Sequence, residues 1–422
     1  TILTGAYSHE HGVDRLSQPI NEGIWTLPEA LQAAGYRTQI IGKWHIGSAP
    51  RGFDDYAVLD DQGEYWDPRF LTPKGEEKSA GYATDVITER TLAWLREHGR
   101  EQPFLLHMHH KAPHRPFVPP PRLYHWLEDV AIPEPETLFD DYATRASPAS
   151  SQAMEIARHM RLDYDLKVVP RGKLTYDLVE RELPAFEEAF GDMNEAFLAN
   201  PPTGEALTRW KYQRYMKDYL RCVKAVDESV GRLLDTLDEL GLAKNTIVVY
   251  SSDQGFFNGE HGWFDKRWIY EESLGMPLVM RWPALIKPGT SVQPMVQNTD
   301  HAPTLAEAAG VPVPASVRGR SLWPLLRGET PADWRSSVYY RYIDEGHKVA
   351  RHDGVRTATH TLACFAETGE WELYELASDP HQVRNRVDDP ELATVREQLR
   401  RELAAYRENL KVPVFPPGPD KR

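Results

Sequence analysis

The sequence predicts an α/β fold in which a mostly parallel sheet is sandwiched between helices, followed by a smaller C-terminal α+β subdomain. Apolar strand patterns alternate with amphipathic helix patterns along most of the chain, as is typical of parallel sheets covered on both faces. After Pro331, short runs of alternating apolar and polar residues follow one another, which favours antiparallel strands. We therefore expect a larger domain over residues 1–333 and a subdomain over residues 334–422.

Each predicted element depends on a local signal. The helix Leu27–Ala34 begins at a capping box, in which Thr26 can accept from the amide of Glu29, and it ends before Gly35. The helix from about Trp210 to Leu240 carries apolar residues at steps of three and four. The other expected elements are strands at 38–41, 104–108 and 245–250, a helix at 85–97, an irregular insertion with short helices at 119–203, antiparallel strands at 338–342, 355–356, 361–365 and 371–376, and a last helix at 390–410.

Composition narrows the class of protein. The 422 residues are 41% hydrophobic and 27% charged, which is ordinary for a globular chain. The net charge of −14 argues against a nucleic-acid partner, although buried cations could still bind an anionic substrate. No apolar run approaches the ~18 residues of a membrane span, and two distant cysteines exclude a disulfide scaffold.

The first candidate cluster lies at the end of the strand near residue 40. If the strand persists, its two-residue period places Lys43 and His45 on one side and Trp44 on the other. An ammonium beside an imidazole suits an anionic oxygen group. The alternative is a solvated lysine and a structural histidine.

The second cluster follows the strand at 104–108. Pro113 forces an extended turn after this strand, so Lys111 and His114 are expected at the carboxyl end of the strand. His107 and His109 suggest a zinc site, but no carboxylate or cysteine stands near them in sequence to complete one. Hydrogen bonding in the core is the favoured role for these two histidines.

The third cluster follows the strand at 245–250. Asp253 and Gln254 offer a carboxylate and an amide oxygen, which suit a hard cation such as Ca²⁺ better than zinc. A surface turn is the alternative. The later Glu260, His261 and Lys266 favour a functional site over that turn.

Together these segments resemble the type I sulfatases of the alkaline phosphatase superfamily, and within them bacterial enzymes similar to N-acetylglucosamine-6-sulfatases and mucin-desulfating sulfatases. The matching segments, in the family's order, are Thr1–Gly5 with Tyr7–Val13, Gly35–His45, Lys111–Phe117, Ser252–Glu272 and Glu372–Pro380. The resemblance covers most of the chain outside Pro119–Thr203.

The resemblance implies a role for each candidate residue. Lys43 and Lys266 would hold the sulfate oxygens, His45 would serve the nucleophile as a base, and His114 would act as general acid on the leaving oxygen. Asp253 and Gln254 would hold Ca²⁺, in preference to Mg²⁺ or Mn²⁺. Further candidates for contacts with the substrate are Lys111, His347, His352, Arg115 and Trp263. For Arg115, Trp263, His347 and His352, a packing role is the alternative.

The sequence departs from the family at its start. The formylglycine nucleophile is expected about six residues before Thr1, with an Asp-Asp pair of metal ligands further upstream, so the chain as given is expected to be truncated and inactive. Gln254 stands where Asn is commoner.

The expected activity is hydrolysis of a sulfate ester on a carbohydrate, with 6-O-sulfated N-acetylglucosamine as the candidate substrate. The alternatives are a phosphodiesterase or phosphonate monoester hydrolase of the same superfamily, and a non-catalytic protein that binds sulfated glycans. A secreted or periplasmic location is expected, and the oligomeric state stays open.

Overall fold

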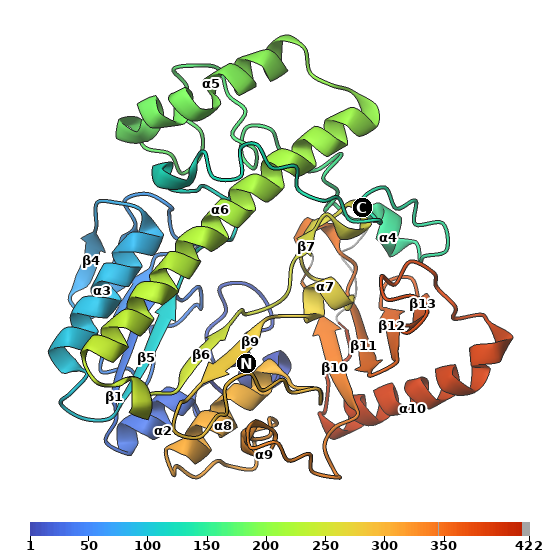
Figure 1. Cartoon of the computed structure of the whole chain (residues 1–422). Helices are drawn as coiled ribbons and strands as arrows, with labels where there is room; N and C mark the ends of the chain where they lie inside the picture. Colours follow the sequence, from blue (N-terminus) through green and yellow to red (C-terminus); the bar gives the residue numbers. More distant parts are fainter. Residues whose placement is uncertain (345, 416–422) are drawn as a thin grey trace.

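A computed structural model describes residues 1–344 and 346–415. Its largest sheet has the strand order β4-β3-β2-β1-β5 (Figure 1). β1 (Arg37–Lys43) is parallel to β2 (Asp55–Leu59) on one side and to β5 (Phe104–His109) on the other. β3 (Arg69–Thr72) and β4 (Gly75–Lys78) extend the sheet in antiparallel fashion beyond β2. The sequence did not predict β2, β3 or β4.

Helices cover both faces of this sheet, which confirms the predicted fold class. Ile41 points to the face packed by α3 (Ala83–His98) and α6 (Gly204–Glu239). Its neighbour Ile40 lies on the opposite face, because successive strand residues alternate in direction. On that side α2 (Leu27–Ala33) packs with α8 (His301–Ala308). Thr26 caps α2 by accepting from the amide of Glu29, as predicted.

Two of the predicted strands are only partly buried. β5 forms the edge of the large sheet. β6 (Val248–Ser251) pairs with β9 (Leu278–Arg281) in a separate antiparallel pair. Each strand has a hydrogen-bonded neighbour on one side only within the described part of the chain, which explains the exposure.

The segment 119–203 is more regular than the sequence predicted. It includes the short helix α4 (Pro148–Ser151) and also α5 (Leu183–Ala199), a helix of 17 residues. Phe186 and Phe190 of α5 are buried against Tyr124. Figure 1 shows α5 above the N-terminal half of α6, away from the large sheet. The buried residues of α5 pack on Tyr124 and on Trp210 of α6.

Near the C-terminus, four antiparallel strands form a second sheet, which confirms the predicted strands. The order is β10 (Ser337–Tyr342), β11 (His352–Thr357), β12 (His360–Phe365) and β13 (Trp371–Glu375). The helix α10 (Ala393–Asn409) packs against this sheet (Figure 1). The division of the chain near Trp334 stays a prediction. In residues 1–344 and 346–415, no helix is long and apolar enough to cross a bilayer.

Candidate active site

The carboxyl end of β1 carries Lys43 and His45. Gly42, just before them, has a φ of +109°, and a Cβ atom there would lie 1.8 Å from the carbonyl oxygen of His109. Only glycine allows this approach of β1 to β5. β1 ends at Lys43, and His45 has a positive φ of 48°. The predicted alternation along a strand therefore does not extend to His45, although the charge of Lys43 still acts on its ring.

Cations gather around Lys43. Burial, and then the charge of Lys266, lower the pKa of Lys43 to about 8, with a further contribution from Lys111. Asp253 and Asp61 act in the opposite direction. Lysines held this close to one another favour an anion between them, because its charge would relieve their mutual repulsion.

His114 lies beside the same lysines. Its Nδ1 is 2.8 Å from the carbonyl oxygen of Arg115. Since a carbonyl can only accept, Nδ1 carries the proton, and Nε2 offers a lone pair in the neutral ring. Burial, followed by the charges of Lys266 and Lys43, lowers the pKa of His114 to about 2. The ring is therefore neutral near pH 7, and it can become an acid when an anion offsets the two lysines.

His45 has two partners at one nitrogen. Its Nε2 is 3.2 Å from Oδ1 of Asp61 and 3.2 Å from Nε2 of Gln62. The carboxylate accepts from a protonated Nε2, whereas the amide donates to a bare one. Burial and the charge of Lys43 lower the pKa of His45, which favours the neutral form that a base requires. The sequence missed Asp61, although the apolar run of β2 before it was a usable signal.

His107 and His109 form a hydrogen-bonded chain. Nδ1 of His109 is 3.0 Å from the carbonyl oxygen of Lys43, and Nδ1 of His107 is 3.1 Å from Nε2 of His109. His109 must donate to the carbonyl, so His107 donates to His109. These contacts confirm the hydrogen-bonding role that was preferred over zinc ligation, and they support the backbone of Lys43.

Asp253 and Gln254 follow β6. Asp253 is exposed, and its charge acts on both Lys43 and His109, which places it on the side of the lysines. Carboxylate and amide oxygens fit Ca²⁺ in their chemistry, but two residues supply too few ligands for an ion that takes at least about six oxygens. Over residues 1–344 and 346–415, no group of at least three His, Cys, Asp or Glu could hold a metal ion.

A buried carboxylate holds Lys266. Asp265, at the end of β8 (Phe264–Asp265), has its Oδ1 3.5 Å from Nζ of Lys266 and 2.7 Å from Nη1 of Arg267. Its Oδ2 is 3.2 Å from Nε2 of His347. Burial acts to raise the pKa of Asp265, but the charges of Lys266 and Arg267 hold it well below its usual value. Asp265 therefore ties Lys266 and His347 to one point.

The other histidine and the tryptophan proposed for the substrate pocket lie in the core. His352 is fully buried; its Nε2 accepts from the amide of Ile269 at 3.2 Å, and its Nδ1 donates to the carbonyl of Ala350 at 2.8 Å. Neither nitrogen is left for a ligand, which contradicts the expected substrate contact. Trp263 is also fully buried, with its Nε1 2.8 Å from the hydroxyl of Tyr142. Both residues take the packing role.

Two candidate cations have partners in the segment 119–203. Nζ of Lys111 is 3.6 Å from Oδ2 of Asp177 and lies over the ring of Tyr65 at 5.0 Å. Arg115 binds Asp165 through two hydrogen bonds of 2.8 and 2.7 Å. No sequence pattern indicated Asp165 or Asp177, because neither follows a predicted strand. Lys111 is therefore buried with its charge already paired.

Family models match along nearly the whole chain. The sulfatase model matches residues 1–311, and the model for the C-terminal part of N-sulphoglucosamine sulphohydrolase matches residues 259–409. An N-acetylglucosamine-6-O-sulfatase of Bacteroides thetaiotaomicron is 41% identical, with 97% of this chain and 77% of the relative covered. An N-acetylglucosamine-6-sulfatase of Capra hircus is 25% identical, with 93% and 72% covered.

Solved structures agree. A protein in complex with its substrate D-glucosamine-2-N,6-O-disulfate matches with a TM-score of 0.94 and 40% identity, over 97% of this chain and 87% of that one. A phosphonate monoester hydrolase of Silicibacter pomeroyi matches with a TM-score of 0.73 at 22% identity, over 97% and 84%, which shows the shared fold alone. The chain therefore belongs to the sulfatase family, as a sulfuric ester hydrolase with the alkaline-phosphatase-like fold.

Proposed function

We propose that this sulfatase removes the 6-O-sulfate from an N-acetylglucosamine or N-sulfated glucosamine unit of a carbohydrate. The observation that carries the proposal is the cluster of Lys43, Lys266 and His114 around the carboxyl end of β1. The substrate class is supported by the relative that is 41% identical and named for this activity, and by the similar protein bound to glucosamine disulfate.

The three residues have complementary tasks. Lys43 and Lys266 bind sulfate oxygens and stabilise the charge that grows on them as the ester bond breaks. The bound anion offsets these lysines and raises the proton affinity of His114, whose Nε2 then delivers a proton to the departing sugar oxygen. His45 has the opposite role and accepts a proton as the base that serves the nucleophile. Gln62 can donate to its bare Nε2, and Asp61 can accept from the protonated form.

Two further groups complete the proposal. Asp253 and Gln254 would contribute oxygen ligands to Ca²⁺, which supplies positive charge beside the sulfate. A formylglycine would supply the nucleophile of the reaction. A secreted or periplasmic location stays a prediction.

The second candidate is phosphodiester or phosphonate hydrolysis, because a phosphonate monoester hydrolase shares this fold. The protein expressed from its complete coding sequence would be given N-acetylglucosamine-6-sulfate and bis-p-nitrophenyl phosphate in parallel. We expect kcat/KM to be at least roughly 100-fold higher for the sulfate ester. A preference for the phosphodiester would reject the proposal.

The position of cleavage has its own test. Glucosamine carrying both a 2-N- and a 6-O-sulfate would be digested, and the product identified by mass spectrometry and NMR. We expect the 6-O-sulfate to be released and the N-sulfate to remain. Release of the N-sulfate alone would assign the pocket to the other position.

A further inference from the structure

A buried ammonium lies behind the loop that carries His114. Lys167, from the segment 119–203, is 1% exposed. Its Nζ donates to the carbonyl oxygens of Pro116, Phe117 and Asp165 at 2.9, 3.0 and 2.8 Å. An ammonium has three N–H donors, which these carbonyls share with a carboxylate of α6. Two of the three carbonyls belong to the loop that follows His114.

Helix α6 supplies the counter-charge. Oδ2 of Asp218 is 3.0 Å from Nζ of Lys167, and Asp218 also binds Arg214 and Arg221 at 3.1 and 3.0 Å. All four side chains are at most 3% exposed. Because buried charges need partners, this network fixes Lys167 between α6 and the loop.

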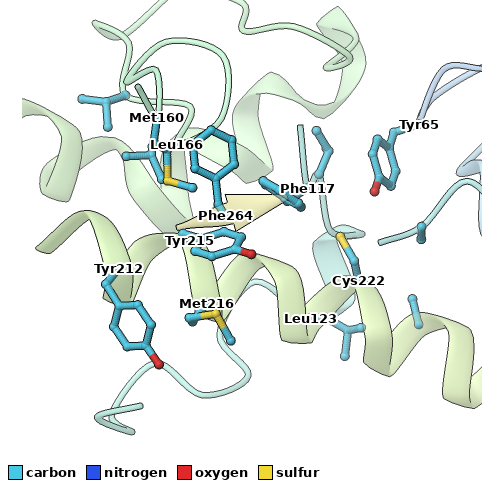
Figure 2. Close-up of a cluster of buried hydrophobic side chains, with 14 of the residues drawn as sticks. Tyr65, Phe117, Leu123, Met160, Leu166, Tyr212, Tyr215, Met216, Cys222 and Phe264 are labelled. Carbon is cyan, nitrogen blue, oxygen red and sulfur yellow. The ribbon is translucent and has the colours of Figure 1, made fainter. Parts of the chain in front are cut away.

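The same segment contacts the loop at two more points. Asp165, two residues before Lys167, forms the double hydrogen bond with Arg115. Leu166 and Phe117 belong to one buried apolar cluster beside α6, as Figure 2 shows. The backbone after His114 is therefore held by an ammonium, by an ion pair and by apolar packing, all from residues 165–167 and α6.

These contacts determine the orientation of the His114 ring. Its Nδ1 donates to the carbonyl of Arg115, and its own carbonyl accepts from the hydroxyl of Tyr65 at 2.6 Å. If the Arg115 and Pro116 peptides turned, the acceptor of Nδ1 would move and the ring would turn with it. We propose that Lys167 is a positioning residue that aims Nε2 of His114 at the leaving oxygen of the ester; this inference rests on the proposed sulfatase role of His114.

The test compares Lys167→Met with Lys211→Met. Lys211 is a matched control: it is 6% exposed and donates to the carbonyls of Ala157 and Met160 at 2.9 and 3.2 Å, in the same segment. The substrates are the sugar sulfate, whose leaving group needs a proton, and p-nitrophenyl sulfate, whose leaving group does not. We expect Lys167→Met to lower kcat roughly 100-fold on the sugar sulfate and far less on the nitrophenyl ester. Lys211→Met should change both rates by the same small factor.

Two further measurements separate positioning from a loss of folded protein. In a His114→Ala background, Lys167→Met should cause no additional loss on the sugar sulfate. Equal losses of Lys167→Met on both substrates, or losses that multiply in the double variant, would overturn the inference. If Lys167→Met does not fold, Asn194→Ala replaces it, because Nδ2 of Asn194 donates to the Lys167 carbonyl at 2.9 Å. We expect a smaller loss of kcat, again larger on the sugar sulfate than on the nitrophenyl ester. Equal losses on both substrates would again overturn the inference.

Failure of the proposed function would look different. Wild-type protein would then hydrolyse p-nitrophenyl sulfate but not the sugar sulfate. An alkyl sulfate would then replace the sugar sulfate as the ester with a poor leaving group. The same comparison of Lys167→Met with Lys211→Met would decide the role of Lys167.

Discussion

The lowered pKa of Lys43 predicts how substrate capture depends on pH. Only the ammonium form attracts sulfate, and the pKa of this lysine is lowered from 10.5 to about 8. Raising the pH from 7 to 9 should reduce the protonated fraction from roughly 90% to roughly 10%, whereas a lysine with its ordinary pKa would stay almost fully protonated. We therefore expect kcat/KM for the sugar sulfate to fall about tenfold between pH 7 and pH 9.

Lys43→Arg is the control, because a guanidinium keeps its charge over this range. The variant should have a lower kcat/KM than the wild type, but one that hardly changes between pH 7 and pH 9. The measurement is the pH profile of kcat/KM, which reports on groups of the free enzyme. Wild-type activity that persists at pH 9, or an equal loss in Lys43→Arg, would refute the idea that Lys43 controls this step.

Three other predictions follow from the site and its support. Gly42→Ala should destabilise the protein by at least ~3 kcal/mol in denaturant unfolding, because its Cβ would meet the His109 carbonyl; Gly35→Ala, with φ +86° and nothing within 4 Å, should lose only ~1 kcal/mol, and equal effects would contradict the close approach of β1 and β5. His347→Ala should raise KM for the sugar sulfate roughly tenfold, while His352→Phe should lower stability by ~1–3 kcal/mol and leave KM unchanged; the opposite pattern would reverse their roles. Asp253→Asn should weaken Ca²⁺ binding at least about tenfold in calorimetry, and unchanged affinity would remove Asp253 from the metal site.

Local patterns in the sequence were sufficient for much of the fold and for the centre of the site. The capping box at Thr26 and the apolar runs of β1 and β5 are local signals, each of which spans only a few consecutive residues. A parallel strand ends where ligand sites form in open α/β sheets, so Lys43 and His114 could be proposed from position alone. The strands β3 and β4 were missed because each has only four residues and β4 is wholly exposed, which leaves no apolar alternation to detect.

Local patterns alone were enough to assign the family and the fold class and to propose residues for binding sulfate. Which groups support those residues became visible only in the folded chain. Asp165 and Lys167 reach the His114 loop across 50 and 51 residues. His352 is fully buried with both nitrogens on backbone groups, whereas His347 is partly exposed and has its Nε2 beside Asp265. Such contacts depend on how distant segments pack, and no spacing along the chain encodes them, because a hydrogen bond is fixed by three-dimensional distance and direction.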